Sequence, residues 1–133
     1  MNACTVTIFT TTDGKESKTV QKGEMQFSTP VLLWYSDENA KVTLTVERNV
    51  VCIQREGDYG MSLRLEQGKT TDGFLTINGA QGQMKTHTTK VNYSVSNTSL
   101  LLLLHYSLMF GDEQQERQER QEMQIRLTAR IEK

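Results

Sequence analysis

Apolar and polar residues alternate along most of the chain. The clearest stretch runs from 123 to 131, where every second residue is apolar and the residues between are polar. A period of two is that of a β-strand with one face buried and the other in water. Shorter stretches with the same alternation recur at 5–12, 41–48, 61–66 and 91–95. The pattern predicts an all-β protein without an amphipathic helix of ordinary length.

Turn residues separate these stretches. Asp13-Gly14 and Asn78-Gly79 are typical of tight two-residue hairpins. Further strands are expected at 17–28, 31–35, 50–55, 69–77, 83–89 and 100–110, which gives about ten strands in all. Short connections favour an antiparallel up-and-down meander, and closing such a sheet into a barrel removes its exposed edges. We predict one domain over residues 1–133, folded as an antiparallel β-barrel of about 8–10 strands.

Four of the expected strands have irregular features. The apolar phase of 17–28 shifts around Gly23, which indicates a bulge. The segment 69–77 contains an Asp-Gly pair, so it is either one bulged strand or two short strands. The segment 83–89 is polar, as expected for an edge or rim strand. The segment 100–110 begins with apolar residues on both faces, so we expect both faces to be covered or the outer face to contact a partner.

The charged segment 113–122 allows two interpretations. Glutamate precedes arginine by four residues in three pairs, an arrangement that stabilises helices: Glu113 and Arg117, Glu116 and Arg120, Glu122 and Arg126. The segment is shorter than the about 12 to 15 residues that an isolated helix needs, and it lacks an apolar stripe. We therefore favour an extended, solvated end of the last hairpin, with a short helical turn that caps the barrel as the alternative.

The charge balance and the cysteines exclude several classes of function. The chain has 15 Lys and Arg against 16 Asp and Glu, which argues against a nonspecific nucleic-acid or anionic-membrane surface. Cys4 and Cys52 have no metal-ligand spacing, so two free thiols are expected. The N-terminus lacks a signal peptide, and the longest apolar run, Leu100–Leu104, is far too short to span a bilayer. We expect a cytoplasmic protein.

The order of several motifs is similar to that of a known family. These motifs are VTLTVERNVVCIQREG, with Arg55-Glu56-Gly57 as an Arg-x-Gly motif, then MSLRLEQG, TINGAQG and LLLHYSLMFG. Together they resemble the YwiB-like family, small uncharacterised bacterial proteins, over about Val6 to Ile131. The resemblance implies a lipocalin-like (calycin-type) β-barrel. It implies no activity and no catalytic residues.

Motifs of catalysis and cofactor binding are missing from the sequence. It contains no GxSxG motif, no phosphate-binding loop and no dinucleotide-binding glycine motif followed by a helix. His87 and His105 do not have the spacing of metal ligands. His105 and Tyr106 point to opposite faces of one strand, so they form no dyad with each other. We expect no enzyme, no cofactor and no metal site.

Arg55 is the first candidate for a binding residue. It shares its parity with Val51 and Ile53, so it points into the barrel if they do. A buried guanidinium needs a partner. This partner is either a carboxylate of the chain or the anionic head group of a ligand, which arginine binds well. The opposite parity would place Arg55 in solvent. Trp34, His105 and Tyr106 are the other candidates for ligand contact.

Two functions follow from a barrel of this size, which can hold one small ligand or be filled by its own side chains. The leading hypothesis is noncatalytic binding of a small, partly apolar or anionic ligand at the barrel mouth. The alternative is a protein-interaction or structural module with a filled interior. It would act through the apolar strand face of Leu101, Leu103 and Met109, where a homodimer could form, or through the charged hairpin.

Overall fold

The computed structural model describes residues 1–37, 39–110 and 119–132. The expectation for the charged segment 113–122 lies mostly outside these residues; its last four residues, from Glu119, belong to the final strand.

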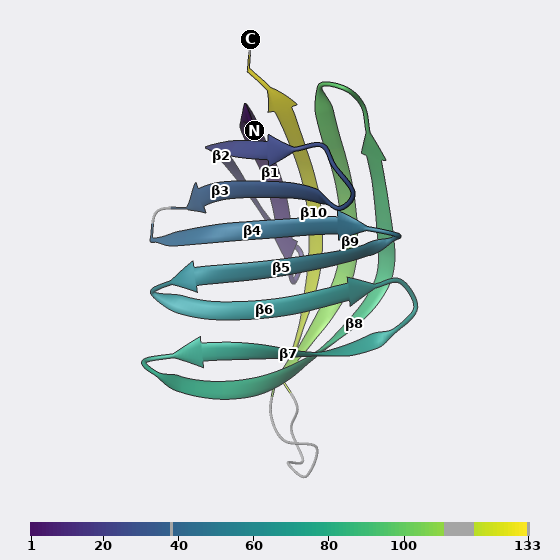
Figure 1. The fold of residues 1–133 in the computed structure, drawn as a ribbon. Coiled ribbons are helices and arrows are strands. Elements are labelled where there is room, and N and C mark those ends of the chain that lie inside the picture. Colours follow the sequence, from purple (N-terminus) through teal and green to yellow (C-terminus); the bar gives the residue numbers. More distant parts are fainter. Residues whose placement is uncertain (38, 111–118, 133) are drawn as a thin grey trace.

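Ten strands make up the fold (Figure 1). They are β1 (Asn2–Thr12), β2 (Lys15–Gln26), β3 (Val31–Asp37), β4 (Ala40–Glu47), β5 (Val50–Gly57), β6 (Tyr59–Glu66), β7 (Thr70–Ile77), β8 (Ala80–Val95), β9 (Ser99–Phe110) and β10 (Glu119–Ile131). Each strand pairs with its neighbours in sequence, and β1 pairs with β10, so the sheet closes into a barrel. All pairings are antiparallel. The prediction of an all-β, antiparallel, up-and-down barrel is confirmed.

The barrel has two walls whose strands cross at a steep angle. Figure 1 shows β3–β7 stacked above one another and running across the view, whereas β9, β10 and the later part of β8 run nearly upright behind them. β2 and β8 are long enough to take part in both walls, because each changes its neighbours along its length.

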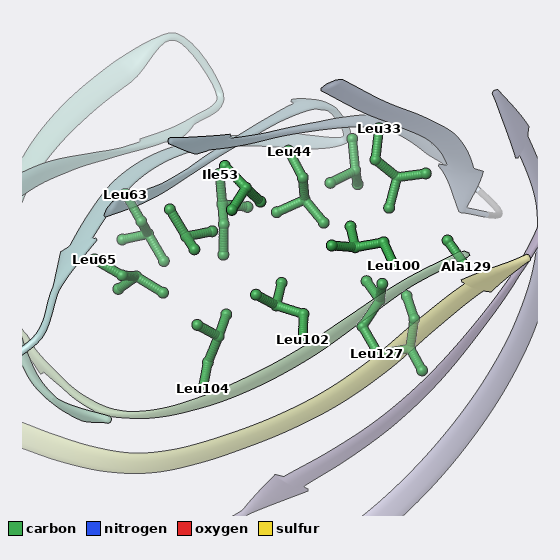
Figure 2. Close-up of a cluster of buried hydrophobic side chains, with 14 of the residues drawn as sticks. Leu33, Leu44, Ile53, Leu63, Leu65, Leu100, Leu102, Leu104, Leu127 and Ala129 are labelled. Atoms are coloured by element: carbon green, nitrogen blue, oxygen red, sulfur yellow. The ribbon is translucent and has the colours of Figure 1, made fainter. Parts of the chain in front are cut away.

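Inward-facing side chains fill the space between the walls. Every second residue of β9 is buried, from Leu100 through Leu102 and Leu104 to Leu108, and faces the apolar residues of β4–β6. Figure 2 shows leucines from both walls meeting in the middle of the barrel. Since full burial of one leucine contributes about 2 kcal/mol, this core is the main source of stability.

The structure corrects two expectations about the strands. The register of β1 and β2 continues without a shift through Gly23, so the predicted bulge is wrong. Gly23 is instead needed because a Cβ atom there would lie 2.4 Å from the carbonyl oxygen of Trp34. The segment 83–89 is not an edge or rim strand. It is part of β8 and pairs with both β7 and β9, and its bulge falls between Thr88 and Lys90.

Two open alternatives are also settled. The segment 69–77 is not split in two, because β7 continues through its Asp-Gly pair in unbroken register with β8. In β9 only the inner face is fully covered. On the outer face Leu101 is 42% exposed and Leu103 is half-buried. We find no partner surface against them in the described part of the chain.

The cysteines are free thiols, as expected: Cys4 is buried and Cys52 is half-buried. Burial, followed by the nearby Glu132 and Glu24 carboxylates, raises the pKa of the Cys4 thiol. Among the described residues there is no helix that is long and apolar enough to cross a bilayer.

Candidate functional site

Arg55 lies on the inward face of β5, together with the buried Val51 and Ile53. Its side chain is only 11% exposed. Nη2 lies 2.8 Å from Asp58 Oδ1, and Nη1 donates a hydrogen bond of 2.6 Å to the carbonyl oxygen of Tyr59. The guanidinium also stacks 3.6 Å from the centre of the Tyr59 ring. Of the two expected partners, a carboxylate of the chain is the one found.

The Arg-x-Gly motif joins two turns at one end of the barrel. A Cβ atom on Gly57 would lie 2.1 Å from the carbonyl oxygen of Asn39, so only glycine fits there. The next residue, Asp58, donates its N–H to the same carbonyl oxygen at 3.3 Å. Arg55 then ties Asp58 and Tyr59 back to β5. The motif thus has a structural role at the junction of the β3–β4 and β5–β6 turns.

Two tyrosines face the interior near this junction, the half-buried Tyr35 and the buried Tyr106. Burial, with a further contribution from Asp37, raises the pKa of Tyr35 to about 12, and Arg55 opposes the shift. Burial, followed by the nearby Tyr35, raises the pKa of Tyr106 above its usual range. Both phenols are therefore neutral at physiological pH and can act only as hydrogen-bonding groups.

Thr86 and Thr88 place two further hydroxyls inside the barrel. Both residues are fully buried. Thr88 lies opposite Tyr106 on the neighbouring strand, and Thr86 lies opposite Leu108. Neither hydroxyl has a hydrogen-bond partner among the described residues. Sequence reasoning missed this pair because short polar residues were taken as a sign of solvent exposure.

Trp34 lies on the outer face of β3, since its neighbours Leu33 and Tyr35 pack against the core. It lines a groove of about 690 Å³ on the outer wall, with Lys22, Glu24 and Lys41 among the lining residues. A second groove of about 620 Å³ adjoins it and is lined by Arg55, Tyr59 and Phe74. Gln54 and Glu56 line both grooves, so the two form one surface, which we call the outer groove.

Cross-strand pairing gives the outer groove a regular floor. A single row of paired residues crosses β3 to β7: Trp34, Thr43, Gln54, Ser62 and Phe74. The two aromatic residues are four strands apart, or about 19 Å at the usual strand spacing. The three residues between them carry hydroxyl or amide groups. Phe74 is 41% exposed.

The four predicted site residues do not form one site. Trp34 lines the outer groove, and the mostly buried Arg55 borders it at the β5–β6 turn, where its guanidinium contacts Asp58 and Tyr59. Tyr106 is 4% exposed in the interior. His105 lies on the outer face of β9, between Lys90 and Gln124 on the neighbouring strands. Phe74, Gln54 and Ser62 belong to the groove and were not predicted. In the part of the chain that the structure describes, no three potential metal ligands come together.

Comparisons with known proteins agree with this fold. Residues 4–125 match the family model described as a domain of unknown function, DUF1934. The crystal structure of the ywiB protein from Bacillus subtilis superimposes with a TM-score of 0.78. The alignment covers 99% of this chain and 93% of that chain at 17% sequence identity, so it establishes the fold alone. Curated proteins give no match. Because the family model covers most of the chain, this protein belongs to the DUF1934 family, whose YwiB-like barrel the sequence motifs had indicated.

Proposed function

We propose that this barrel is a noncatalytic binding domain and that its ligand lies in the outer groove. The observation that carries the proposal is the row of paired residues from Trp34 to Phe74, with two partly exposed aromatic rings and a polar floor. Ligand sites combine apolar contact area with a few placed polar groups, and their volumes are about 300–1,000 Å³. Each half of the groove falls within that range.

The charges around the groove favour an uncharged or zwitterionic ligand. Three cationic side chains, Lys22, Lys41 and Arg55, line it together with three anionic ones, Glu24, Glu56 and Asp58. Arg55 and Asp58 already neutralise each other. The groove has no excess of positive charge to attract an anionic ligand. The sequence allowed a partly apolar or an anionic ligand; the proposed ligand is partly apolar, carries hydrogen-bonding groups and has no net charge.

Each group of the floor has a role in this proposal. Trp34 and Phe74 stack on apolar faces of the ligand, because an aromatic ring offers contact area at low entropic cost. The side-chain amide of Gln54 both donates and accepts hydrogen bonds, and the hydroxyls of Thr43 and Ser62 do the same. No nucleophile and base are needed, since the groove only binds.

Trp34 provides the test, because it is the only tryptophan in the chain. Its indole N–H gives one signal in the proton–nitrogen NMR spectrum of labelled protein. A library of uncharged aromatic and hydroxylated fragments is titrated into the protein. We expect the fragments that bind to shift the Trp34 indole signal and the Gln54 side-chain amide, and to leave the methyl signals of Leu102 and Leu104 in place.

Variants separate the groove from the rest of the surface. Gln54→Ala removes an exposed side chain, and Trp34→Ala removes the ring; each is expected to weaken binding by about tenfold, equivalent to about 1.4 kcal/mol. His105→Ala on the opposite wall is the matched control and leaves the affinity unchanged. If no fragment shifts the indole signal, or if the groove variants bind as tightly as the control, the proposal fails.

A ligand inside the barrel is the second candidate, and one observation favours it. The hydroxyls of Thr86 and Thr88 are buried and have no partner among the described residues. A small molecule that displaced the neighbouring core side chains and reached them would satisfy both, beside the neutral Tyr106. In the same titration, such a ligand would shift the Leu102 and Leu104 methyl signals and leave the Trp34 indole in place.

A further inference from the structure

The barrel is closed, but one stretch of β2 has only one neighbouring strand. β2 pairs with β1 from Lys15 to Met25, whereas it pairs with β3 only from Gly23 to Gln26. In the described part of the chain, residues 15–22 therefore have a free edge. Seven of these eight residues are exposed, and Gln21 is half-buried. A free edge presents unpaired N–H and C=O groups that can accept another strand.

The side chains of this edge fall into two sets. Glu16, Lys18, Val20 and Lys22 face outward, because they lie opposite the outward-facing residues of β1. Val20 is 57% exposed, so it offers an apolar contact between two lysines. Ser17, Thr19 and Gln21 alternate with them and face the barrel mouth. An added strand would therefore meet a basic and apolar outer surface and a polar inner one.

Positive charge dominates the outer surface beside this edge. Lys18 and Lys22 stand against Glu16 on the outer face of β2, whereas Lys15 lies opposite Thr12 on the other face. On β10, two strands away, Arg126 lies in the row of Lys18 and Phe9, and Arg130 lies in the row of Lys22 and Thr5. Glu132 pairs with Lys22, and the exposed Glu24 lies on the same outer face of β2, so both offset part of this surplus. The wall remains basic although the whole chain carries a net charge of −1.

We propose that the free edge of β2 binds an extended acidic segment of a partner protein, which adds to the sheet as another strand. Backbone hydrogen bonds provide the affinity in this mode of binding, and alternate side chains provide the specificity. The partner's outward positions meet Lys18, Val20 and Lys22 in turn. Its recognition pattern is therefore acidic, any residue, aliphatic, any residue, acidic.

A second copy of this chain does not fit the same edge. Edge-to-edge pairing of two copies would bring six lysines and two glutamates together, and opposed like charges destabilise strand pairs. Lysines on an edge commonly prevent such self-association. The same lysines favour a partner of opposite charge, so one set of residues excludes the wrong partner and attracts the right one.

The probe is a synthetic peptide, Thr-Glu-Thr-Val-Thr-Glu-Thr, with both ends blocked. Its binding to the full chain is measured by NMR titration and by hydrogen exchange of the β2 amides. We expect shifts and slower exchange confined to residues 15–22. The same peptide with N-methylated backbone amides keeps its charge but cannot form the ladder, and it is expected to bind at least tenfold more weakly.

Protein variants test the charge component. Lys18→Glu is expected to weaken peptide binding by about tenfold. Lys90→Glu, opposite His105 on β8 and four strands from β2, makes the same change in net charge away from the edge and leaves peptide affinity within twofold. The proposal is overturned if the methylated peptide binds as well as the unmodified one, or if both variants weaken binding equally.

Two other outcomes would also overturn the proposal. In the first, a single-stranded oligothymidylate binds the basic wall as tightly as the peptide and does not slow hydrogen exchange of the β2 amides. Binding to this wall would then depend on charge alone and not on strand addition. In the second, the protein dimerises as its concentration rises, and the dimer slows hydrogen exchange of residues 15–22 without any peptide. The edge would then bind a second copy of this chain.

Discussion

Arg55 Nη2 lies 2.8 Å from Asp58 Oδ1, and this ion pair spans the turn between β5 and β6. Asp58 is exposed, whereas the Arg55 side chain is mostly buried. The hydrogen bond from Arg55 holds the pKa of the Asp58 carboxyl below its ordinary value of 3.8. The turn therefore depends on the protonation state of one carboxylate.

The first prediction concerns the pH dependence of this pair. Because the Asp58 pKa is lower in the folded chain, its ionised form stabilises the fold above about pH 4, and this contribution is lost as the pH falls through the folded-state pKa. Asp58→Asn is therefore less stable than the parent at pH 7 and equally stable in strong acid. Urea unfolding from about pH 2 to pH 7 measures the difference. A difference that stays constant across this range would contradict the role of the ion pair.

Gly57 gives a prediction about the other half of the same motif. In Gly57→Ala the new Cβ atom would meet the Asn39 carbonyl oxygen at 2.1 Å and the Ala40 Cα at 2.8 Å, so the backbone must move. We expect a loss of about 3 kcal/mol in the free energy of unfolding. The control is Gly82→Ala, where the nearest atom, the Leu75 carbonyl oxygen, is 3.8 Å away. Equal stability of the two variants would show that the turns adapt freely.

The parity of the strands could be predicted from the sequence where one face is apolar and the other polar. For Arg55 the prediction was conditional, because residues 50–53 are apolar on both faces: Arg55 faces inward if Val51 and Ile53 do, and the structure shows that they do. The carboxylate partner could not be named, because Asp58 lies beyond the end of the strand and reaches Arg55 through the turn.

Trp34 shows where the same reasoning fails. It stands in a run that is apolar on both faces, from Val31 to Tyr35, so alternation cannot tell which side is inside. Trp34 belongs to a row of paired residues that begins with Thr43 beside it and ends at Phe74. This row depends on the register of four hairpins. Register follows from turn geometry and from packing across the barrel, neither of which the local pattern contains.

The inner tyrosines predict how the protein responds to alkali. The pKa of Tyr35 is raised to about 12 by burial and Asp37, so the folded state holds the phenol proton more tightly than the unfolded state. Stability is therefore fully present below about pH 10 and declines as the pH rises from there towards 12. In Tyr35→Phe this decline is expected to be smaller. Thermal unfolding at about pH 8, 10 and 11 measures it, and an unchanged pH profile would contradict the shift.

The buried hydroxyl of Thr88 gives a prediction whose sign is informative. Valine has nearly the same shape and removes a hydroxyl that has no partner among the described residues. Thr88→Val is expected to raise the free energy of unfolding by about 1 kcal/mol, because an unsatisfied buried group costs about 1–3 kcal/mol. A loss of stability would instead mean that a bound molecule satisfies the hydroxyl, which would favour a ligand inside the barrel.

Thr71→Val is the matched control for this change. Thr71 is only half-buried, and its hydroxyl donates to the carbonyl oxygen of Arg64. Removing it breaks a hydrogen bond that is made, and we expect a loss of about 1 kcal/mol. Opposite signs for the two variants, both measured by urea unfolding, would separate an unsatisfied hydroxyl from a satisfied one.

The last prediction concerns Phe9, on the outer face of the basic wall. The Arg126 guanidinium carbon lies 4.4 Å from the centre of the Phe9 ring, and Lys18 Nζ lies 5.5 Å from it. A cation over an exposed aromatic ring contributes about 0.5–1 kcal/mol. In a double-mutant cycle with Phe9→Leu and Arg126→Gln, unfolding energies should therefore give a coupling of about 0.5–1 kcal/mol. In the control cycle, Arg130→Gln replaces Arg126→Gln. Arg130 is also on β10, but it lies opposite Thr5 of β1 and not opposite Phe9. Its coupling to Phe9 should therefore be near zero. Equal coupling in the two cycles would mean that the ring responds to the charge of the whole wall and not to the cation stacked on it.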